Sequence, residues 1–572
     1  MRYHALATDY DGTLARHGAT DDSTIAAVAQ LREVGRRPIL VTGRRLDDLR
    51  GVFARLDLFD RVVAENGAVL YNPGNHRERL LCEPPPPSFA ERLRAAGAPV
   101  DTGRVIVSTW IPHESKALAV LRDMGLAHQI IFNKGAVMIL PPRVDKAFGL
   151  QAALEDLGLS PRNTVAVGDA ENDLALLELC QFSVAVANAL ASVKEEVDWV
   201  TDGDHGLGVC QLIRRMIADD LREFDRLGRR RRLTLGLRAD GSEELLAPYG
   251  NTILLSGGSG SGKSTFAAGF LERLAALGYQ YCCVDPEGDY SALPGAVVLG
   301  TAMQAPVIDE VSALLSTAGQ SCVVNMVAVP LLERPAVFSN LFADLLALRA
   351  RSGRPQWIMI DETHHLWPAR RQGGRVLIPE DLDGVMLLVP HADQVEPALI
   401  RHVNMVIAMG EESDARFREF GRAAGCDVPV PPGALNRGEA WVWRLGAASM
   451  CRLRTLGPSV ARRRHLRKYV QGELEQDRCF YFRGPDHRLK LRAQNLVTFI
   501  QLADGVDNGT WEYHLRRGDY SRWFRDVIKD ADLADEAVQV ESDPALTAEE
   551  SRERVAQLID QRYTLPATSL YK

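Results

Sequence analysis

Short apolar runs alternate with amphipathic segments of helical length over two long stretches of the chain, residues 1 to about 218 and about 233 to 457. This alternation is typical of βαβ units, so it predicts an α/β protein with two mainly parallel sheets. In open sheets of this kind, ligands bind at the carboxyl ends of the strands. Polar residues that directly follow an apolar run are therefore the first candidates for functional side chains.

The chain has 572 residues, which at about 150 residues per domain predicts three to four domains. Hydrophobic residues make up 46% and charged residues 25%, a balance that excludes a disordered chain or a small disulfide scaffold. We expect a first domain at 1–218, with an inserted cap at about 72–140. A second α/β domain is expected at 219–460, followed by a mainly helical domain at 461–572. The four prolines at 84–87 predict a loop or a stiff connector.

The cysteine pattern and the apolar segments favour a cytoplasmic protein. The nine cysteines contain no CxxC pair, as expected for reduced thiols, and no secretory signal follows Met1. Residues 311–332 carry no charge and are long enough to span a bilayer. Because they include Gln320, Asn325 and Pro330, we expect a helix, a turn at 317–321 and a strand, with no membrane partner.

Two aspartates follow the first apolar run, in HALATDYDGTL. Asp9 and Asp11 are two residues apart, and carboxylates this close repel each other unless a cation lies beside them. Further signals follow in order: Thr42 after PILV, Lys146 in VDK, Asp169, Asn172 and Asp173 in GDAEND, and Asn188 after SVAVA.

In this order and spacing, the DxDGT sequence, the threonine, the lysine and the GDxxND sequence resemble the haloacid dehalogenase superfamily of phosphatases. The closest likeness is to its Cof-type branch, which has an inserted α/β cap; it covers about the first 215 residues and includes AENGA around Glu65–Gly67. The resemblance implies a Rossmann-like core that hydrolyses a phosphorylated substrate with Mg²⁺.

The resemblance also assigns roles to individual residues. It implies that Asp9 is the nucleophile that forms an aspartyl-phosphate, and that Asp11 protonates the leaving group and then activates water. Thr42 and Lys146 would hold the phosphoryl oxygens. The implied Mg²⁺ ligands are Asp9, Asp11, Asp169 and Asp173, with Asn172 in support.

A glycine-rich loop follows the apolar run of NTILLSGGSGSGKSTF. Its spacing, Gly257-x4-Gly262-Lys263-Ser264, is that of a P-loop, in which backbone N–H groups bind phosphates, the lysine reaches the β and γ oxygens, and the serine ligates Mg²⁺. The sequence therefore predicts an ATP site. Its candidate residues are Gly257, Gly260, Gly262, Lys263, Ser264 and Thr265.

A second apolar run, QWIMIDETHHLW, ends in Asp361 and Glu362. Asp361 is expected to hold Mg²⁺ through water, and Glu362 to polarise the attacking water, which favours hydrolysis over transfer to a substrate hydroxyl. With VDPEGDY and RGEAWVW, residues 235–457 resemble the HerA/FtsK group of ring-forming ATPases. The resemblance implies a homo-oligomer, such as a hexameric ring, with Arg401 as a candidate arginine finger.

The sequence differs from the HerA/FtsK group at one position. That group has a polar sensor residue after the next apolar strand, whereas this sequence has Val389, Pro390 and His391 there. His391 could be the sensor or a surface residue. His364 and His365, directly after Glu362, are expected to orient the site rather than bind metal.

Arginine-rich runs lie on both sides of the second α/β region, at 229–232 and 462–468. They could be solvated linker surface or could contact nucleic-acid phosphates, despite the net charge of −8. In the C-terminal region, His514 and Asp519 could form a site, although a packing pair is the simpler interpretation.

The joint purpose of the two predicted sites stays open at this point. The first hypothesis is a phosphatase that is gated or assembled by an ATP-binding ring. The alternative is a nucleic-acid machine in which a motor serves a phosphatase for polynucleotide ends. A kinase–phosphatase pair is disfavoured by the adjacent Asp361 and Glu362, and a scaffold without catalysis is a further option.

Overall fold

The computed structural model describes residues 1–133, 135–224, 231–258, 260–369, 378–379, 382–459, 474, 478–486, 489–528 and 530–562. The chain divides into two units. The first comprises 1–286 and 293–460, and the second comprises 287–292 and 461–572. The basic run 462–468, together with Arg229 and Arg230, lies outside the described residues.

The N-terminal part of the first unit is built on a sheet whose strands have the order β12-β11-β10-β1-β2-β3-β4-β5 in the described residues. The strands from β12 to β3 are parallel, and β4 and β5 are antiparallel additions. Their bounds are β1 Ala5–Thr8, β2 Arg37–Val41, β3 Arg61–Ala64, β4 Val69–Asn72, β5 Arg77–Leu80, β10 Thr164–Gly168, β11 Phe182–Ala185 and β12 Trp199–Val200.

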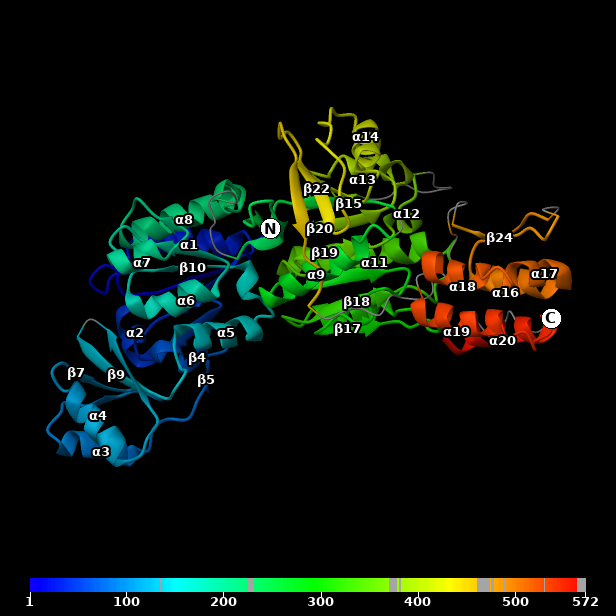
Figure 1. Ribbon diagram of the computed structural model, residues 1–572. Coiled ribbons are helices and arrows are strands. Elements are labelled where there is room, and N and C mark those ends of the chain that lie inside the picture. The colour runs from blue at the N-terminus through cyan, green and yellow to red at the C-terminus, as the bar shows by residue number, and fades with distance from the viewer. Residues whose placement is uncertain are drawn as a thin grey trace. The chain divides into compact units, whose positions relative to one another are not determined.

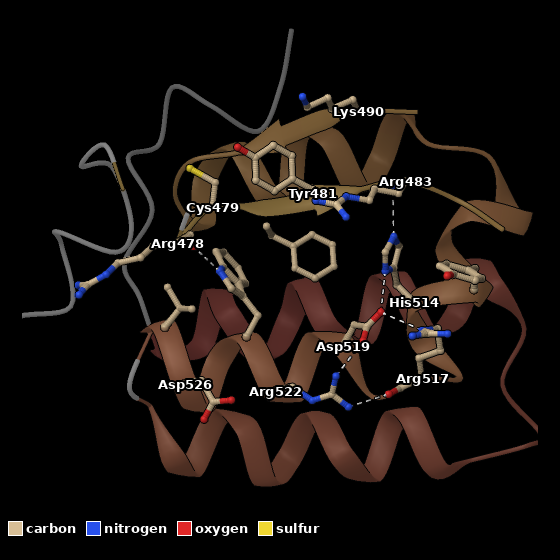
Figure 2. Close-up of a pocket in the computed structure, with 14 residues that line it drawn as sticks. Arg478, Cys479, Tyr481, Arg483, Lys490, His514, Arg517, Asp519, Arg522 and Asp526 are labelled. Atoms are coloured by element: carbon tan, nitrogen blue, oxygen red, sulfur yellow. Dashed lines mark hydrogen bonds and ion pairs between the residues drawn. The ribbon is translucent and has the colours of Figure 1, made fainter. Parts of the chain in front are cut away.

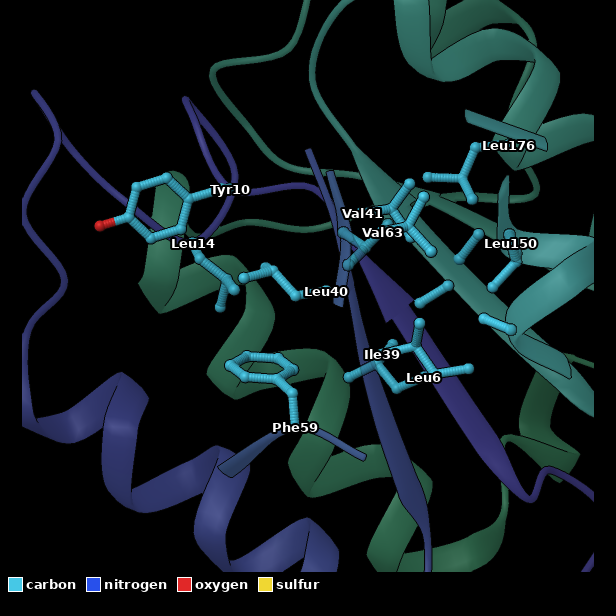
Figure 3. Packing of buried hydrophobic residues seen from close by; sticks show 14 of the residues in the cluster. Leu6, Tyr10, Leu14, Ile39, Leu40, Val41, Phe59, Val63, Leu150 and Leu176 are labelled. Atoms are coloured by element: carbon cyan, nitrogen blue, oxygen red, sulfur yellow. The ribbon is translucent and has the colours of Figure 1, made fainter. Parts of the chain in front are cut away.

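Helices cover both faces of this sheet. Figure 1 shows α1 (Asp22–Glu33) and α8 (His205–Asp219) together on one side of β10, and α6 (Leu174–Leu179) on the other. The central strands are continuous apolar runs because neither face meets water. Figure 3 shows the resulting core, with Leu6 and Ile39 packed between the layers.

The cap is a separate small α/β layer within this part. Its antiparallel sheet has the order β6-β7-β9-β8, with bounds β6 Asp101–Thr102, β7 Val107–Trp110, β8 Gln129–Asn133 and β9 Ala136–Leu140. Two helices pack with it, α3 (Pro87–Ala95) and α4 (Glu114–Asp123). The predicted proline connector is thus shorter than expected: Pro87 is the first residue of α3, a position where the missing N–H costs nothing.

The second part of this unit has a mixed sheet with the order β14-β13-β23-β22-β21-β15-β20-β19-β16-β18-β17 in the described residues. The seven strands from β21 to β17 are parallel, and the other four are antiparallel additions at one side. Their bounds are β13 Leu233–Leu237, β14 Glu243–Leu246, β15 Thr252–Ser256, β16 Tyr281–Asp285, β17 Ala296–Leu299, β18 Ser321–Asn325, β19 Trp357–Ile360, β20 Val385–Val389, β21 Met405–Met409, β22 Glu439–Arg444 and β23 Cys451–Thr455.

Helices accompany this sheet: α9 (Lys263–Ala276), α10 (Ile308–Leu315), α11 (Arg334–Ser352), α12 (Thr363–Leu366), α13 (Pro397–Ile400) and α14 (Ser413–Ala424). The uncharged stretch at 311–332 forms the end of α10, a turn and β18, as its polar residues predicted. In the described part of the chain, no helix is long and apolar enough to cross a membrane.

The second unit contains an antiparallel pair, β24 (Phe480–Phe482) and β25 (Leu491–Ala493), and a group of helices. The helices are α16 Leu496–Gly505, α17 Asn508–Leu515, α18 Asp519–Trp523, α19 Ala531–Ser542 and α20 Ala548–Arg562. Thr547 caps α20: its hydroxyl accepts from Glu550 N–H at 3.2 Å, and the Glu550 carboxylate accepts from Thr547 N–H at 2.9 Å.

Candidate functional site

Four predicted residues meet at the carboxyl edge of the N-terminal sheet. Asp9 directly follows β1 and Asp169 directly follows β10, its parallel neighbour. Asp173 ends the short helix η4 (Glu171–Asp173), and Lys146 is the first residue of α5 (Lys146–Asp156). The spacing in the sequence predicted this convergence because parallel strands end at the same edge.

Lys146 joins two of the carboxylates. Its Nζ lies 2.6 Å from Asp9 Oδ1 and 2.5 Å from Asp173 Oδ1. The other oxygen of Asp173 accepts hydrogen bonds from the backbone N–H groups of Asp169 and Ala170, both at 3.0 Å. One oxygen from each of Asp9, Asp169 and Asp173 lies within 4.8 Å of the others.

The charges of this cluster favour a bound cation. All three carboxylates are buried, and Lys146 is 1% exposed. Burial raises the pKa of Asp9 to about 7, although the Lys146 ammonium opposes that shift. Burial alone would lower the pKa of Lys146, but the Asp173 and Asp9 carboxylates outweigh it and raise the pKa. Three carboxylates beside one ammonium leave an excess of negative charge out of water, which a divalent cation with carboxylate ligands would offset.

The glycine and threonine of DxDGT support Asp169. Gly12 has a φ of +93°, and a Cβ on it would lie 2.2 Å from Asp169 Oδ2. The Thr13 hydroxyl donates to Asp169 Oδ1 at 3.1 Å. Asn188 donates to the Gly12 carbonyl at 2.8 Å, which fixes the loop from the other side. Gly12 is thus required both for its backbone conformation and for the close approach of a carboxylate.

Asp11 departs from the prediction that it joins the metal ligands. Its carboxylate is held by Arg44 in a two-pronged ion pair, with Nε–Oδ2 and Nη2–Oδ1 distances of 2.6 Å. In the described residues, the converging carboxylates do not include it. The physical reason is the planar guanidinium, whose two parallel donors match both oxygens of one carboxylate. Arg44 was not predicted, although it directly follows the Thr42–Gly43 pair in the sequence.

Thr42 and Asn172 also lie at this edge. Thr42 is buried after β2, and its hydroxyl accepts from Arg44 N–H at 3.1 Å. The Asn172 Nδ2 atom is buried and has no hydrogen-bond partner in the described residues. A buried amide donor without a partner is costly unless a ligand completes it, so Asn172 suits an oxygen-rich ligand here.

Glu65, noted in the sequence only as part of AENGA, has a structural role that the sequence did not reveal. Its carboxylate accepts from the backbone N–H groups of Arg104, Val105 and Ile106, at 2.7, 2.8 and 2.9 Å. Residue 65 lies in the core and residues 104–106 lie in the cap, between β6 and β7. Glu65 therefore ties the cap to the core.

The glycine loop lies between β15 and α9 in the second sheet. Gly260 and Gly262 have φ values of +78° and +102°, and a Cβ on Gly257 would lie 2.6 Å from the Met409 carbonyl oxygen. Lys263 Nζ donates to the Gly257 carbonyl at 2.6 Å. Ser264 and Thr265 follow in the first turn of α9.

The loop fits a phosphate group. The Ser261 hydroxyl is buried without a hydrogen-bond partner in the described part of the chain. The glycines allow the backbone N–H groups at the start of α9 to point toward an anion, since no side chain blocks the approach. The geometry of the loop thus leaves room for an anionic group, and its identity as ATP stays a prediction.

Asp361 and Glu362 follow β19, which is separated from β15 by the single strand β20. Asp361 is 2% exposed, and its Oδ1 accepts from Glu362 N–H at 2.9 Å. Glu362 has a φ of +41°, which is rare for a residue with a side chain and concentrates at functional sites. His364 Nδ1 lies 3.4 Å from the Glu362 carboxylate, and one ligand atom from each of Glu362, His364 and His365 lies within 4.8 Å of the others. That these histidines orient the site rather than bind metal stays a prediction.

His391 follows β20, the strand between these two elements. Its Nδ1 lies 3.2 Å from Glu419 Oε2, and Arg416 contacts both residues. The Ser256 hydroxyl at the end of β15 donates to the Pro390 carbonyl at 3.2 Å. The segment with His391 is thus tied to the glycine loop strand. Arg401 is exposed at the end of α13.

Comparisons with known proteins concern the N-terminal part of the chain. A family model for haloacid dehalogenase-like hydrolases matches residues 6–84 and 122–213. A phosphoglycolate phosphatase from Methanothermobacter thermautotrophicus is 30% identical over 223 residues, which are 37% of this chain and 98% of the relative. The same enzyme from Natronomonas pharaonis is 32% identical over 222 residues, with 37% and 96% covered. A haloacid dehalogenase-like hydrolase structure from Bacteroides thetaiotaomicron covers 37% of this chain and 99% of its own, with 19% identity and a TM-score of 0.33.

A parallel sheet with buried carboxylates and a lysine at its carboxyl edge, together with these relatives, defines the class as a phosphoryl-transferring hydrolase. Through its N-terminal 215 residues, the chain belongs to the haloacid dehalogenase-like hydrolases. The predicted family and the Rossmann-like core of this part are confirmed.

Proposed function

We propose that this chain hydrolyses a small phosphate monoester with Asp9 as the nucleophile, and that its second α/β region binds and hydrolyses ATP. The first proposal rests on one observation: Lys146 bridges Asp9 and Asp173 within a cluster of three buried carboxylates. We place the phosphatase domain at 1–218, the ATPase domain at 219–460 and a helical domain at 461–572. The cap was predicted at about 72–140, but β5 (Arg77–Leu80) pairs in the core sheet, so the cap begins after residue 80.

In the proposed reaction, an oxygen of Asp9 attacks phosphorus while the bond to the leaving oxygen breaks. Asp11 gives its proton to that oxygen, then takes a proton from water as the water attacks the aspartyl-phosphate and releases phosphate and Asp9. Thr42 and Lys146 hold phosphoryl oxygens, and Arg44 orients Asp11. A Mg²⁺ held by Asp9, Asp169 and Asp173 would neutralise the phosphoryl charge.

The relatives suggest which substrate to test first. Both relatives described above are named phosphoglycolate phosphatase, so we propose a small phosphorylated carboxylic acid of this kind. The small cap, tied to the core through Glu65, is the element that would select it.

The test of the first site is turnover of phosphoglycolate with Mg²⁺. We expect Asp9→Asn to lower the rate by about a thousandfold or more, since the nucleophile is lost. The control is Asp57→Asn, an exposed residue paired only to Arg55 at 2.9 Å in the described structure. Retained turnover in Asp9→Asn would show that the nucleophile assignment is wrong.

The ATPase proposal is supported by the order of the strands and by the glycine loop. Gly257, Gly260, Gly262, Lys263, Ser264 and Thr265 would bind the ATP phosphates, and Ser264 and Asp361 would hold Mg²⁺. Glu362 would polarise the attacking water. By its likeness to HerA/FtsK ATPases, we propose a homo-oligomer, such as a hexameric ring, with Arg401 of a neighbouring copy as a candidate finger.

Contacts within the first unit support gating of the phosphatase by the ATPase. Asn163 is buried at the start of β10; its side chain accepts from Gln356 Nε2 at 2.6 Å and donates to the Gly353 carbonyl at 3.2 Å. Tyr279 donates to Gln181 Oε1 at 2.7 Å. Asn163 and Gln356 precede their strands, whereas the proposed sites follow the strands. Any coupling would therefore pass through the sheets rather than through direct contact between sites.

Lys263→Ala tests whether the two proposed activities are independent. We expect this substitution to abolish ATP hydrolysis and to leave phosphoglycolate hydrolysis by Asp9 intact. An unchanged ATPase rate in Lys263→Ala would count against the P-loop assignment. A change in phosphoglycolate turnover when ATP is added to the wild-type chain, absent in Lys263→Ala, would support gating.

The alternative is a nucleic-acid machine in which the motor serves a phosphatase for polynucleotide ends. Its support is the basic sequence beside the ATPase region, including Arg231 and Arg232. The test is the ATPase rate with and without DNA or RNA at two salt concentrations. Stimulation that fades with salt would favour this alternative, because phosphate contacts release counterions; no response at either salt would favour the gated phosphatase.

A further inference from the structure

The second unit contains a cavity that neither proposed site uses. It has a volume of about 720 Å³ and is formed by β24, the region before β25, α17 and α18 (Figure 2). This volume lies in the range of pockets that hold small organic ligands.

The cavity is strongly basic. Five basic side chains line it against two acidic ones: Arg478, Arg483, Lys490, Arg517 and Arg522 against Asp519 and Asp526. Burial lowers the pKa of His514, which keeps this imidazole neutral at neutral pH. The ligand that complements such a lining is an anion.

Asp519 neutralises only part of the positive charge that lines the cavity. Its carboxylate lies 3.3 Å from Arg522 Nη1 and 3.6 Å from Arg517 Nε, so two arginines share one carboxylate. Across the described residues, Arg483 and Lys490 have no ion pair with any carboxylate. Positive charge is therefore available at the mouth of the cavity.

Two arginines lie over tyrosine rings. The Arg483 guanidinium is 5.4 Å from the Tyr481 ring centre, and the Arg517 guanidinium is 5.1 Å from the Tyr513 ring centre. These contacts place two guanidinium groups beside aromatic rings, and a guanidinium group can bind two phosphate oxygens at once. Aromatic rings and guanidinium planes are also the surfaces on which nucleobases stack.

His514 positions this arrangement. Its Nε2 accepts the Arg483 backbone N–H at 3.1 Å, and its Nδ1 lies 2.9 Å from Asp519 Oδ2, as Figure 2 shows. With both ring nitrogens engaged, His514 is a positioning residue rather than a proton carrier. The histidine–aspartate pair predicted as a packing pair thus links Arg483, the residue after β24, to α18, which begins at Asp519.

We propose that this cavity binds a nucleotide. Arg483, Lys490 and Arg517 bind its phosphate, and the rings of Tyr481 and Tyr513, which also line the cavity, hold its base. The bound group is either a free nucleotide or the terminal nucleotide of a single-stranded nucleic acid. This proposal does not depend on the proposed phosphatase or ATPase activity.

The experiment is a calorimetric titration of the full-length chain with AMP, in EDTA. All samples carry Lys263→Ala and Asp9→Asn, so that neither proposed site hydrolyses a ligand. Heat from phosphate binding at those sites is the same in every sample, and the cavity variant therefore isolates the contribution of the cavity. We expect AMP to bind, and the double variant Arg483→Gln/Lys490→Gln to weaken binding by at least about tenfold, because charge-assisted phosphate contacts are lost. The matched control is Arg554→Gln, an exposed arginine on α20 outside the cavity.

Two further probes, a 5′-phosphorylated dinucleotide and inorganic phosphate, define the outcome. If a 5′-phosphorylated dinucleotide binds more tightly than AMP, the natural ligand is the end of a nucleic-acid strand. If it binds equally or more weakly, the natural ligand is a free nucleotide. Inorganic phosphate that binds as tightly as AMP would overturn base recognition. Absence of binding by both AMP and the dinucleotide, or equal losses in the cavity variant and the Arg554 control, would overturn the proposal.

Discussion

The two proposed sites of the first unit both lie at the carboxyl ends of parallel strands, each in its own sheet, yet they use opposite charges. At the first, side chains supply the chemistry: Asp9, Asp169 and Asp173 concentrate buried negative charge around one lysine. At the second, a glycine loop at the start of α9 leaves backbone N–H groups open to an anion. The first arrangement attracts a cation, and the second attracts phosphate.

The topology of the sheet therefore fixes only where a ligand binds. The residues after each strand decide which ligand it is. This difference between the two sites also predicts different weaknesses. The carboxylate site should fail when a charge is removed, and the glycine site should fail when a methyl group is added.

The largest effect is expected for Lys146→Ala. Removal of the ammonium leaves Asp9 and Asp173 buried without their shared partner, which should cost about 3–5 kcal/mol of stability and nearly all phosphatase activity. Thermal unfolding with and without Mg²⁺ measures this, and the cation should restore more stability in the variant than in the wild type. The control is Lys194→Ala, a partly exposed lysine on α7 (Ala191–Glu195). Equal melting temperatures would contradict the buried-charge account.

Glu362→Gln should separate ATP binding from ATP hydrolysis. We expect hydrolysis to fall about a hundredfold or more, because an amide cannot take a proton from water. ATP affinity should stay within about twofold, since the glycine loop is intact. A nucleotide-binding titration and a phosphate-release assay on the same preparation decide this, and parallel losses in both would refute the role of Glu362.

Gly257→Ala should weaken ATP binding by about tenfold, because the new methyl group overlaps the Met409 carbonyl at 2.6 Å and must shift the loop. Gly258→Ala is the matched control, since a Cβ there meets no atom within 4 Å. Comparable ATP affinities in the two variants would mean that the shape of the loop does not set binding.

The smallest effect is expected for Glu65→Gln, at about 1–2 kcal/mol of stability, because a carboxylate that accepts three backbone N–H groups becomes a neutral amide. Glu65 has a φ of +52°. Glutamate and glutamine have the same backbone strain at this angle, so the substitution isolates the charge. Thermal melts and KM for phosphoglycolate measure it, with the exposed Glu83→Gln as control. A change in kcat without a change in KM or stability would argue against a cap anchor.

Much of the first site could be predicted because its residues sit beside unmistakable strands. Asp9 and Asp169 follow apolar runs that pair directly as β1 and β10. The ion pair between Arg44 and Asp11 could not be predicted, since any of several nearby arginines could have reached that carboxylate. The bond of Glu65 to residues 104–106 joins segments 39 to 41 residues apart, and no local pattern encodes that distance.

The two α/β regions, the family of the first and the residues that follow each strand were predictable from the sequence, because hydrophobic periodicity and glycine spacing are local properties of the chain. Three features became visible only in the folded chain: β20 lies between β15 and β19, Asp11 faces an arginine, and the C-terminal arginines and tyrosines line one cavity. These depend on which distant segments pack together, and packing is set by the burial of the whole chain rather than by any short stretch of it.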